Sequence, residues 1–209
     1  MDSNRLKSAL FVAMLIYVLL VVTVFALDKN NNSIQPFGEK PWYWEYQGKP
    51  LLLLGGSNDD NLYQWDENEL IAELDVLASV GGNYVRFTMS SRDSGNIKPF
   101  VRENGLFNLD KPNPDYWNRF ESLLSLALQR DIIAQVEIWA TYDFYWGDSG
   151  WSQNPFNPKL NRSYTASQSQ LPEEIAYPAQ QQNNPFFRSV PELDNNRVVL
   201  DYQQTFVDK

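Results

Sequence analysis

Strands and helices alternate along the middle of this chain, and this order constrains the fold more than any other feature. Residues 51–54, 83–89 and 132–139 are predicted strands, and the apolar runs at 51–54 and 132–139 are of the kind that is buried on both faces. Apolar residues at helical spacing follow Asp66 and Asp115, which we expect to cap two helices. A strand–helix–strand–helix–strand order requires parallel pairing with right-handed crossovers. The chain is therefore expected to have an α/β fold.

A third helix is predicted at the end of the chain. It begins near Asn196, and Val199, Leu200 and Phe206 lie near one face with no capping residue before Lys209. The pattern amounts to about three β/α units, whereas a closed barrel of eight such units needs roughly 250 residues. Two architectures fit: a small open sheet or, as the uncapped helix favours, a partial TIM (β/α)8 barrel.

The N-terminus carries an uncharged apolar run at residues 9–27, which Arg5 and Lys7 precede. A signal peptide and an uncleaved membrane anchor both fit, and the anchor is slightly favoured because about 20 apolar residues span a bilayer. We expect an N-terminal hydrophobic helix at residues 9–27 and a tether at residues 28–41. The rest of the chain would then be an extracytoplasmic domain, membrane-anchored through residues 9–27, or secreted if a signal is cleaved.

Composition excludes several classes of chemistry. The chain has no Cys and no His, which removes thiolate metal sites, Cys nucleophiles, Ser-His-Asp triads and His general bases. We therefore expect no metal and no cofactor. The formal net charge of −9, from 17 basic and 26 acidic residues, argues against a nucleic-acid partner. Carboxylates, Tyr, Lys, Arg, Ser and Thr remain as candidate functional groups.

Two long segments carry no regular pattern. Residues 90–114 form a predicted polar loop with Gly and Pro, and residues 140–195 form a longer one rich in Pro, Asn and Gln. A loop as long as the second is either functional or disordered. Its aromatic residues favour an ordered, functional loop: Tyr142, Phe144, Tyr145, Trp146, Trp151 and Phe156.

Several tracts, taken in order, resemble the clan A glycoside hydrolases, whose cellulase-like members are TIM barrels. Gly48-Lys49-Pro50 followed by LLLLGGSN is similar to the hairpin and first barrel strand of that clan. Residues 83–86 (NYVR) resemble its second strand, and FESLLSLALQRDIIAQVEIW resembles its second helix and third strand. The tract WSQNPFNPKLN is similar to the loop after strand three. The likeness covers residues 42–209 and rests on the order of the tracts, not on one motif.

The resemblance implies a retaining glycosidase that acts with two Glu residues. In the clan the acid/base Glu follows strand four, directly after an Asn, and the nucleophile follows strand seven. The pair Asn68-Glu69 falls inside the first predicted helix, so the catalytic Glu residues are expected beyond Lys209. This gives an exported glycoside hydrolase, present as an N-terminal fragment, with an oligosaccharide or polysaccharide substrate. A membrane-anchored, non-catalytic carbohydrate-binding or interaction domain is the alternative.

Three strand residues are candidates for this site. In the clan an Arg at the position of Arg86 hydrogen-bonds the nucleophile, but Arg86 could equally form a structural ion pair, for which Glu137 is the expected partner. Glu137 and Trp139 point the same way from their strand. Trp139 would lie at the mouth of a barrel, where it could support a sugar or simply pack in the core.

Loop residues complete the set of candidates. Asn58 and Asp59 follow the first predicted strand, and they could bind sugar hydroxyls or form a local Asx turn. Tyr142, Asp143 and Trp146 follow the third strand in a tight cluster. Aromatic faces beside carboxylates suit pyranose rings, while the alternative is aromatic packing that holds the loop together.

Overall fold

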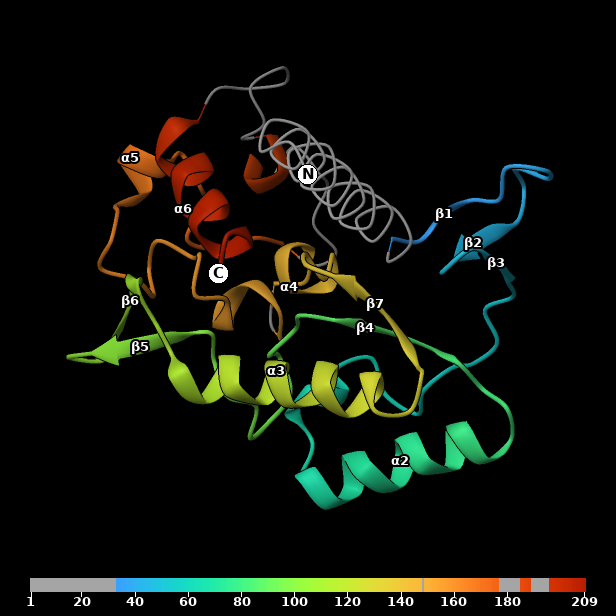
Figure 1. Ribbon diagram of the computed structural model, residues 1–209. Helices are drawn as coiled ribbons and strands as arrows, with labels where there is room; N and C mark the ends of the chain where they lie inside the picture. Colours follow the sequence, from blue (N-terminus) through green and yellow to red (C-terminus); the bar gives the residue numbers. More distant parts are fainter. Residues whose placement is uncertain (1–32, 148, 177–184, 189–195) are drawn as a thin grey trace, which may run out of the picture. The chain divides into compact units, whose positions relative to one another are not determined.

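The computed structural model describes residues 33–147, 149–176, 185–188 and 196–209 (Figure 1). The predicted apolar helix at residues 9–27 lies outside these ranges and stays a prediction. Within them, no helix is long and apolar enough to cross a membrane. The chain divides into two compact units, Met1–Leu53 and Leu54–Lys209.

The described part of the first unit is a small antiparallel sheet. Its strands β1 (Gln35–Pro36), β2 (Trp44–Tyr46) and β3 (Lys49–Leu51) pair in the order β1–β2–β3. Gln47 and Gly48 both have positive φ, 51° and 71°, and they form the two-residue turn between β2 and β3. Positive φ at both central residues matches the twist of hairpin strands. The turn thus begins one residue before the Gly48-Lys49-Pro50 tract that resembled a hairpin, and Lys49 and Pro50 belong to β3.

The first expected parallel strand, residues 51–54, is largely absent, and this prediction was wrong. Only Leu51 belongs to a strand, and that strand, β3, is antiparallel. Leu52 is 64% exposed and Leu54 is 53% exposed. Parallel pairing survives as a single bridge between Gly55 and Tyr84. An apolar run predicts a buried strand only where elements cover both of its faces, and nothing in the run itself specifies that cover.

The second unit contains the expected strand–helix–strand arrangement. Helix α2 (Glu67–Ser79) leads to β4 (Tyr84–Thr88), and helix α3 (Pro114–Leu128) leads to β7 (Ile133–Glu137). Strands β4 and β7 pair in parallel and run side by side in Figure 1, with Phe87 opposite Val136. This parallel pair confirms the core of the sequence prediction. No closed barrel is present among the described residues, which form three small sheets.

The helix caps follow the local sequence. Asp66 caps α2 as expected, because its side chain accepts a hydrogen bond from the backbone N–H of Asn68. The cap of α3 is Asn113 and not Asp115, since Pro114 occupies the first helical position and needs no N–H partner there.

The predicted polar loop at residues 90–114 contains a hairpin instead. Strands β5 (Phe100–Glu103) and β6 (Leu106–Pro112) pair antiparallel. Asn104 and Gly105 connect them with φ of 52° and 85°. Asn-Gly is a strong sequence signal for such a turn, so this hairpin was detectable.

The second unit has two hydrophobic clusters. One lies between the β4–β7 sheet and helices α2 and α3, and its buried members include Leu74, Val85, Phe87 and Leu123. The other is aromatic and gathers the long loop, the hairpin and the last helix; its buried members include Phe144, Trp151, Phe156, Phe186 and Phe206. The second unit also has five short elements: η1 (Leu62–Gln64), α4 (Tyr142–Tyr145), η2 (Trp151–Gln153), α5 (Ala166–Ser169) and η4 (Pro185–Arg188). Of these, η1 contributes Leu62 and Tyr63 to the first cluster.

The last predicted helix is present as α6 (Arg197–Val207), and Asn196 caps it. Val199 and Phe206 are its buried residues, as the expected apolar face requires. The described parts of the long loop, residues 140–147 and 149–176, thus contribute buried side chains to the aromatic cluster.

Candidate functional site

Three segments meet where the parallel strands end. The segment after β4 starts at Met89, and the segment after β7 starts at Ile138. Because β4 and β7 are parallel, both segments leave the same edge of the sheet. The third segment, residues 57–61, is held there by Thr88, whose backbone N–H and hydroxyl both donate to the carbonyl oxygen of Asp60, at 2.6 and 3.1 Å.

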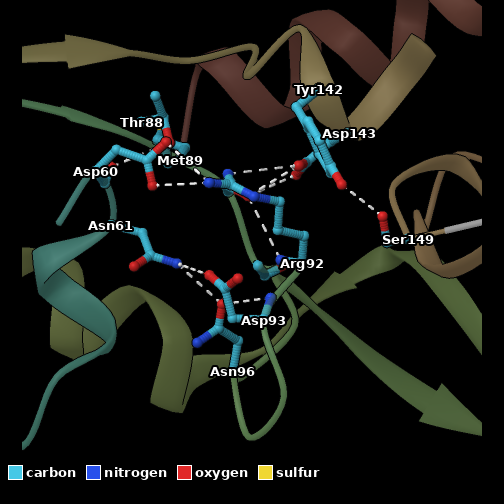
Figure 2. A network of polar contacts seen from close by, with 12 residues as sticks. Asp60, Asn61, Thr88, Met89, Arg92, Asp93, Asn96, Tyr142, Asp143 and Ser149 are labelled. Atoms are coloured by element: carbon cyan, nitrogen blue, oxygen red, sulfur yellow. Dashed lines mark hydrogen bonds and ion pairs between the residues drawn. The ribbon is translucent and has the colours of Figure 1, made fainter. Parts of the chain in front are cut away.

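Polar side chains from all three segments form one network (Figure 2), which we call the strand-end network. Its members are Asp60, Ser90, Arg92, Tyr142 and Asp143. Arg92 lies in the middle. One terminal nitrogen, Nη2, donates to both carboxylate oxygens of Asp60 at 3.0 Å, and Nη1 donates to Ser90 Oγ at 2.8 Å.

Asp143 is the buried acid of this network, with a side chain only 14% exposed. Ser90 Oγ donates to its two carboxylate oxygens at 2.9 and 3.0 Å, and Arg92 Nη1 lies 3.9 Å from Oδ1. Burial raises the pKa of Asp143, while Ser90, Arg92 and Lys98 partly oppose that effect. Burial also lowers the pKa of Lys98, whose ammonium donates to the Ser91 carbonyl.

Tyr142 gives the network an aromatic surface. The Arg92 guanidinium lies over its ring at 5.0 Å from the centroid, which is cation–π geometry. The phenol oxygen is 2.6 Å from Ser149 Oγ, and the Trp146 ring meets the Tyr142 ring edge-on at 5.2 Å. Tyr142 nevertheless remains 38% exposed, so part of its ring is open to a ligand.

A second group of amides and carboxylates orders the loop below Arg92. The Asn61 amide donates to Asp93 Oδ2 at 2.8 Å and to Asn96 Oδ1 at 3.0 Å (Figure 2). Asn61 is almost fully buried. These bonds hold the backbone that follows Arg92. None of them involves the Arg92 side chain.

Arg86 lies on the sheet itself, not in the network. Its guanidinium forms a two-pronged ion pair with Glu137, with Nε–Oε1 at 2.8 Å and Nη2–Oε2 at 2.6 Å. The expected pairing of Arg86 with Glu137 is thereby confirmed. The side chains are 51% and 35% exposed, so the pair stands on an open face of the β4–β7 sheet. A role of Arg86 toward substrate remains a prediction.

Trp139 lies within the aromatic cluster. Its ring centroid is 5.1–6.0 Å from the centroids of four other rings: Phe144, Phe156, Phe186 and Phe206. These contacts are those of core packing, which was the alternative to a sugar platform.

Asn58 and Asp59 turn to local partners. The Asn58 amide donates to Glu73 Oε2 at 2.9 Å, and Asp59 Oδ2 accepts from the Trp65 indole at 3.0 Å. Asp59 Oδ1 also accepts from the backbone N–H of Asp60. Neither side chain belongs to the strand-end network.

Three members of the network were missed from the sequence. Asp60 directly follows Asn58 and Asp59, and Ser90 and Arg92 lie two and four residues after the end of β4. The available signal was their place behind a predicted parallel strand, where polar side chains converge. Tyr142 and Asp143 were expected to act together, and the structure places both in the network. Within the described ranges, no cluster of three or more Asp and Glu is arranged to hold a metal ion.

The fold can be compared with those of known proteins. No family model and no curated protein matches the chain. Among solved structures, a glycoside hydrolase family 5 mannosidase from Rhizomucor miehei aligns with a TM-score of 0.51 at 15% identity, over 85% of this chain and 41% of that one. A family 5 glycoside hydrolase from Bacteroides vulgatus ATCC 8482 aligns with a TM-score of 0.43 at 23% identity, over 53% of this chain and 25% of that one.

These similarities concern the fold. The mannosidase shows that the α/β arrangement is similar to part of a glycoside hydrolase structure, in agreement with the resemblance seen in the sequence. The chain spans between about a quarter and two fifths of the length of these structures.

Proposed function

We propose that this chain is part of a carbohydrate-active protein and that it binds an oligosaccharide or polysaccharide at the strand-end network. The observation that carries the proposal is the exposed Tyr142 ring beside hydrogen-bonding groups at the carboxyl ends of two parallel strands. Barrel enzymes bind their substrates at this end. The similarity to a glycoside hydrolase fold supports the location.

The chemistry of the network suits a sugar. An exposed aromatic ring can pack against the C–H face of a pyranose, and the edge-on Trp146 ring widens that apolar surface. Asp60, whose side chain is 40% exposed, can accept hydrogen bonds from sugar hydroxyl groups, and the Ser149 hydroxyl can donate or accept them. A few polar groups around an aromatic surface are typical of small-ligand sites.

Catalysis needs more than the described residues offer. A retaining glycosidase uses two carboxyl groups about 5 Å apart, one of which must be free to attack the sugar. Asp60 and Asp143 both face Arg92, and Glu137 is paired with Arg86. We therefore propose that the acid/base and nucleophile Glu residues come from further β/α units. A non-catalytic carbohydrate-binding domain is the alternative, and these carboxylate pairings favour it for the 209 residues alone.

Binding can be tested with one matched pair of variants. Mannose-containing oligosaccharides are the first probes, because one of the structures with a similar fold is a mannosidase. Tyr142→Ala should weaken binding about tenfold in calorimetry, a loss of roughly 1.4 kcal/mol. Tyr43→Ala, which removes another exposed tyrosine, in the first unit, should leave affinity unchanged. Equal affinity of the wild type and Tyr142→Ala would refute the assignment.

We also propose export of the chain, with residues 9–27 as a membrane anchor or a cleaved signal. The uncharged length of that run supports this. Expression of the full chain followed by carbonate extraction tests it, and recovery of an intact protein in the soluble fraction would contradict it.

A further inference from the structure

We propose that Arg92 is a positioning residue that holds the Tyr142 ring in its binding orientation. This rests on the proposed carbohydrate site, which it deepens. Arg92 contacts all three segments of the network: Asp60 before η1, Ser90 after β4, and the Tyr142 ring at the start of α4.

The geometry requires a guanidinium. Its N–H groups lie in one plane and point in fixed directions. Both carboxylate oxygens of Asp60 accept from Nη2, and Ser90 Oγ accepts from Nη1. With those bonds made, the plane has one orientation, and its central carbon lies over the Tyr142 ring, 5.0 Å from the centroid. A lysine ammonium would keep the charge but would have no plane to stack.

Other contacts hold the backbone, so Arg92 acts on the side chain of Tyr142. The segment at residues 57–61 is joined to β4 through the bonds from Thr88 to the Asp60 carbonyl. The start of α4 is fixed by the amide of Asn154, which donates to the Asp143 carbonyl at 3.0 Å. Loss of Arg92 should therefore release the ring without unfolding the segments that carry it.

The contacts on the other side of Tyr142 complete the argument. The bond to Ser149 holds the phenol oxygen, and the Trp146 ring packs at an angle of 81° to the Tyr142 ring. A bond at the oxygen still permits rotation of the ring about its long axis. Arg92 lies over the ring and favours one rotation, and that rotation sets the direction in which the ring plane is presented to a sugar.

The experiment labels the protein with fluorotyrosine and follows Tyr142 by fluorine NMR, with the signal assigned by its loss in Tyr142→Phe. Arg92→Met and Arg92→Lys should both shift or broaden this signal while the thermal unfolding stays cooperative. Arg130→Met is the matched control, because Arg130 is as buried (17% against 20% exposed side chain) and pairs with Asp75 away from the network. It should leave the Tyr142 signal unchanged.

The same variants are then titrated with a mannose-containing oligosaccharide. Arg92→Met should bind about tenfold more weakly, because the cation–π contact with Tyr142 is lost. Arg92→Lys should recover little of that loss, because an ammonium lacks the fixed planar donors that bind Asp60 and Ser90 together. An unchanged Tyr142 signal in Arg92→Met would overturn the proposal, as would unfolding of both Arg92 variants, which would assign a structural role. The NMR result does not depend on any sugar, so absence of binding by the wild type would refute the proposed function alone.

Discussion

Phe206 provides the sharpest test of how the last helix is built into the fold. The side chain is 5% exposed and its ring contacts four others. The centroid distances are 5.9 Å to Phe100, 5.3 Å to Trp117, 5.1 Å to Trp139 and 6.1 Å to Phe156. One side chain thus joins α6 to the β5–β6 hairpin, to α3, to the segment after β7 and to the long loop.

The expected cost of Phe206→Ala follows from these contacts. Phe→Ala in a packed core costs about 3–5 kcal/mol, because the transfer free energy is lost and a cavity remains. Four ring contacts place Phe206 in the middle or upper part of that range, at about 4 kcal/mol. For a chain of this size the unfolding temperature should fall by about 8–16 °C.

The assay is thermal and urea unfolding followed by circular dichroism. The neighbouring Val207→Ala is the control, since Val207 is 48% exposed and should change stability by less than about 0.5 kcal/mol. A fall of under 3 °C for Phe206→Ala, or equal effects of the two variants, would refute the packing of α6 on this cluster.

Two further predictions concern carboxylates. Burial raises the pKa of Asp143, so the folded state binds its proton more tightly than the unfolded state, and this contribution to stability is lost as pH rises above about 4. The stability of Asp143→Asn relative to the wild type should therefore increase between pH 4 and pH 7 in urea unfolding, and a difference independent of pH would contradict the burial. The 209-residue chain should release no reducing sugar from manno-oligosaccharides, and hydrolysis that Glu137→Gln abolishes would instead make Glu137 catalytic.

The predictable part of the fold depends on local signals. Asp66 begins α2 because its side chain can bond a nearby backbone N–H, and the alternation of β4, α3 and β7 permits only parallel pairing. Residues 51–54 show the limit of such signals. Their apolar run resembles that of residues 132–139, but the burial of a strand is decided by elements distant in sequence.

The candidate site was predictable where its residues are close in sequence. Tyr142 and Asp143 are adjacent, and their combination was visible. Arg92 is 32 residues from Asp60 and 53 separate Ser90 from Asp143, so these pairings depend on how three segments meet. The aromatic residues of the long loop predicted an ordered loop, and the burial of Phe144, Trp151 and Phe156 in the core agrees with this order.

The open face of the β4–β7 sheet gives the Arg86–Glu137 pair a further property. Water surrounds much of both groups, so their attraction is screened and should weaken as salt is added. A polypeptide strand or a ligand laid across that face would remove this water and lower the local dielectric constant. The salt sensitivity of the pair would then fall. The response of the ion pair to ionic strength would therefore measure how completely that face of the sheet is covered.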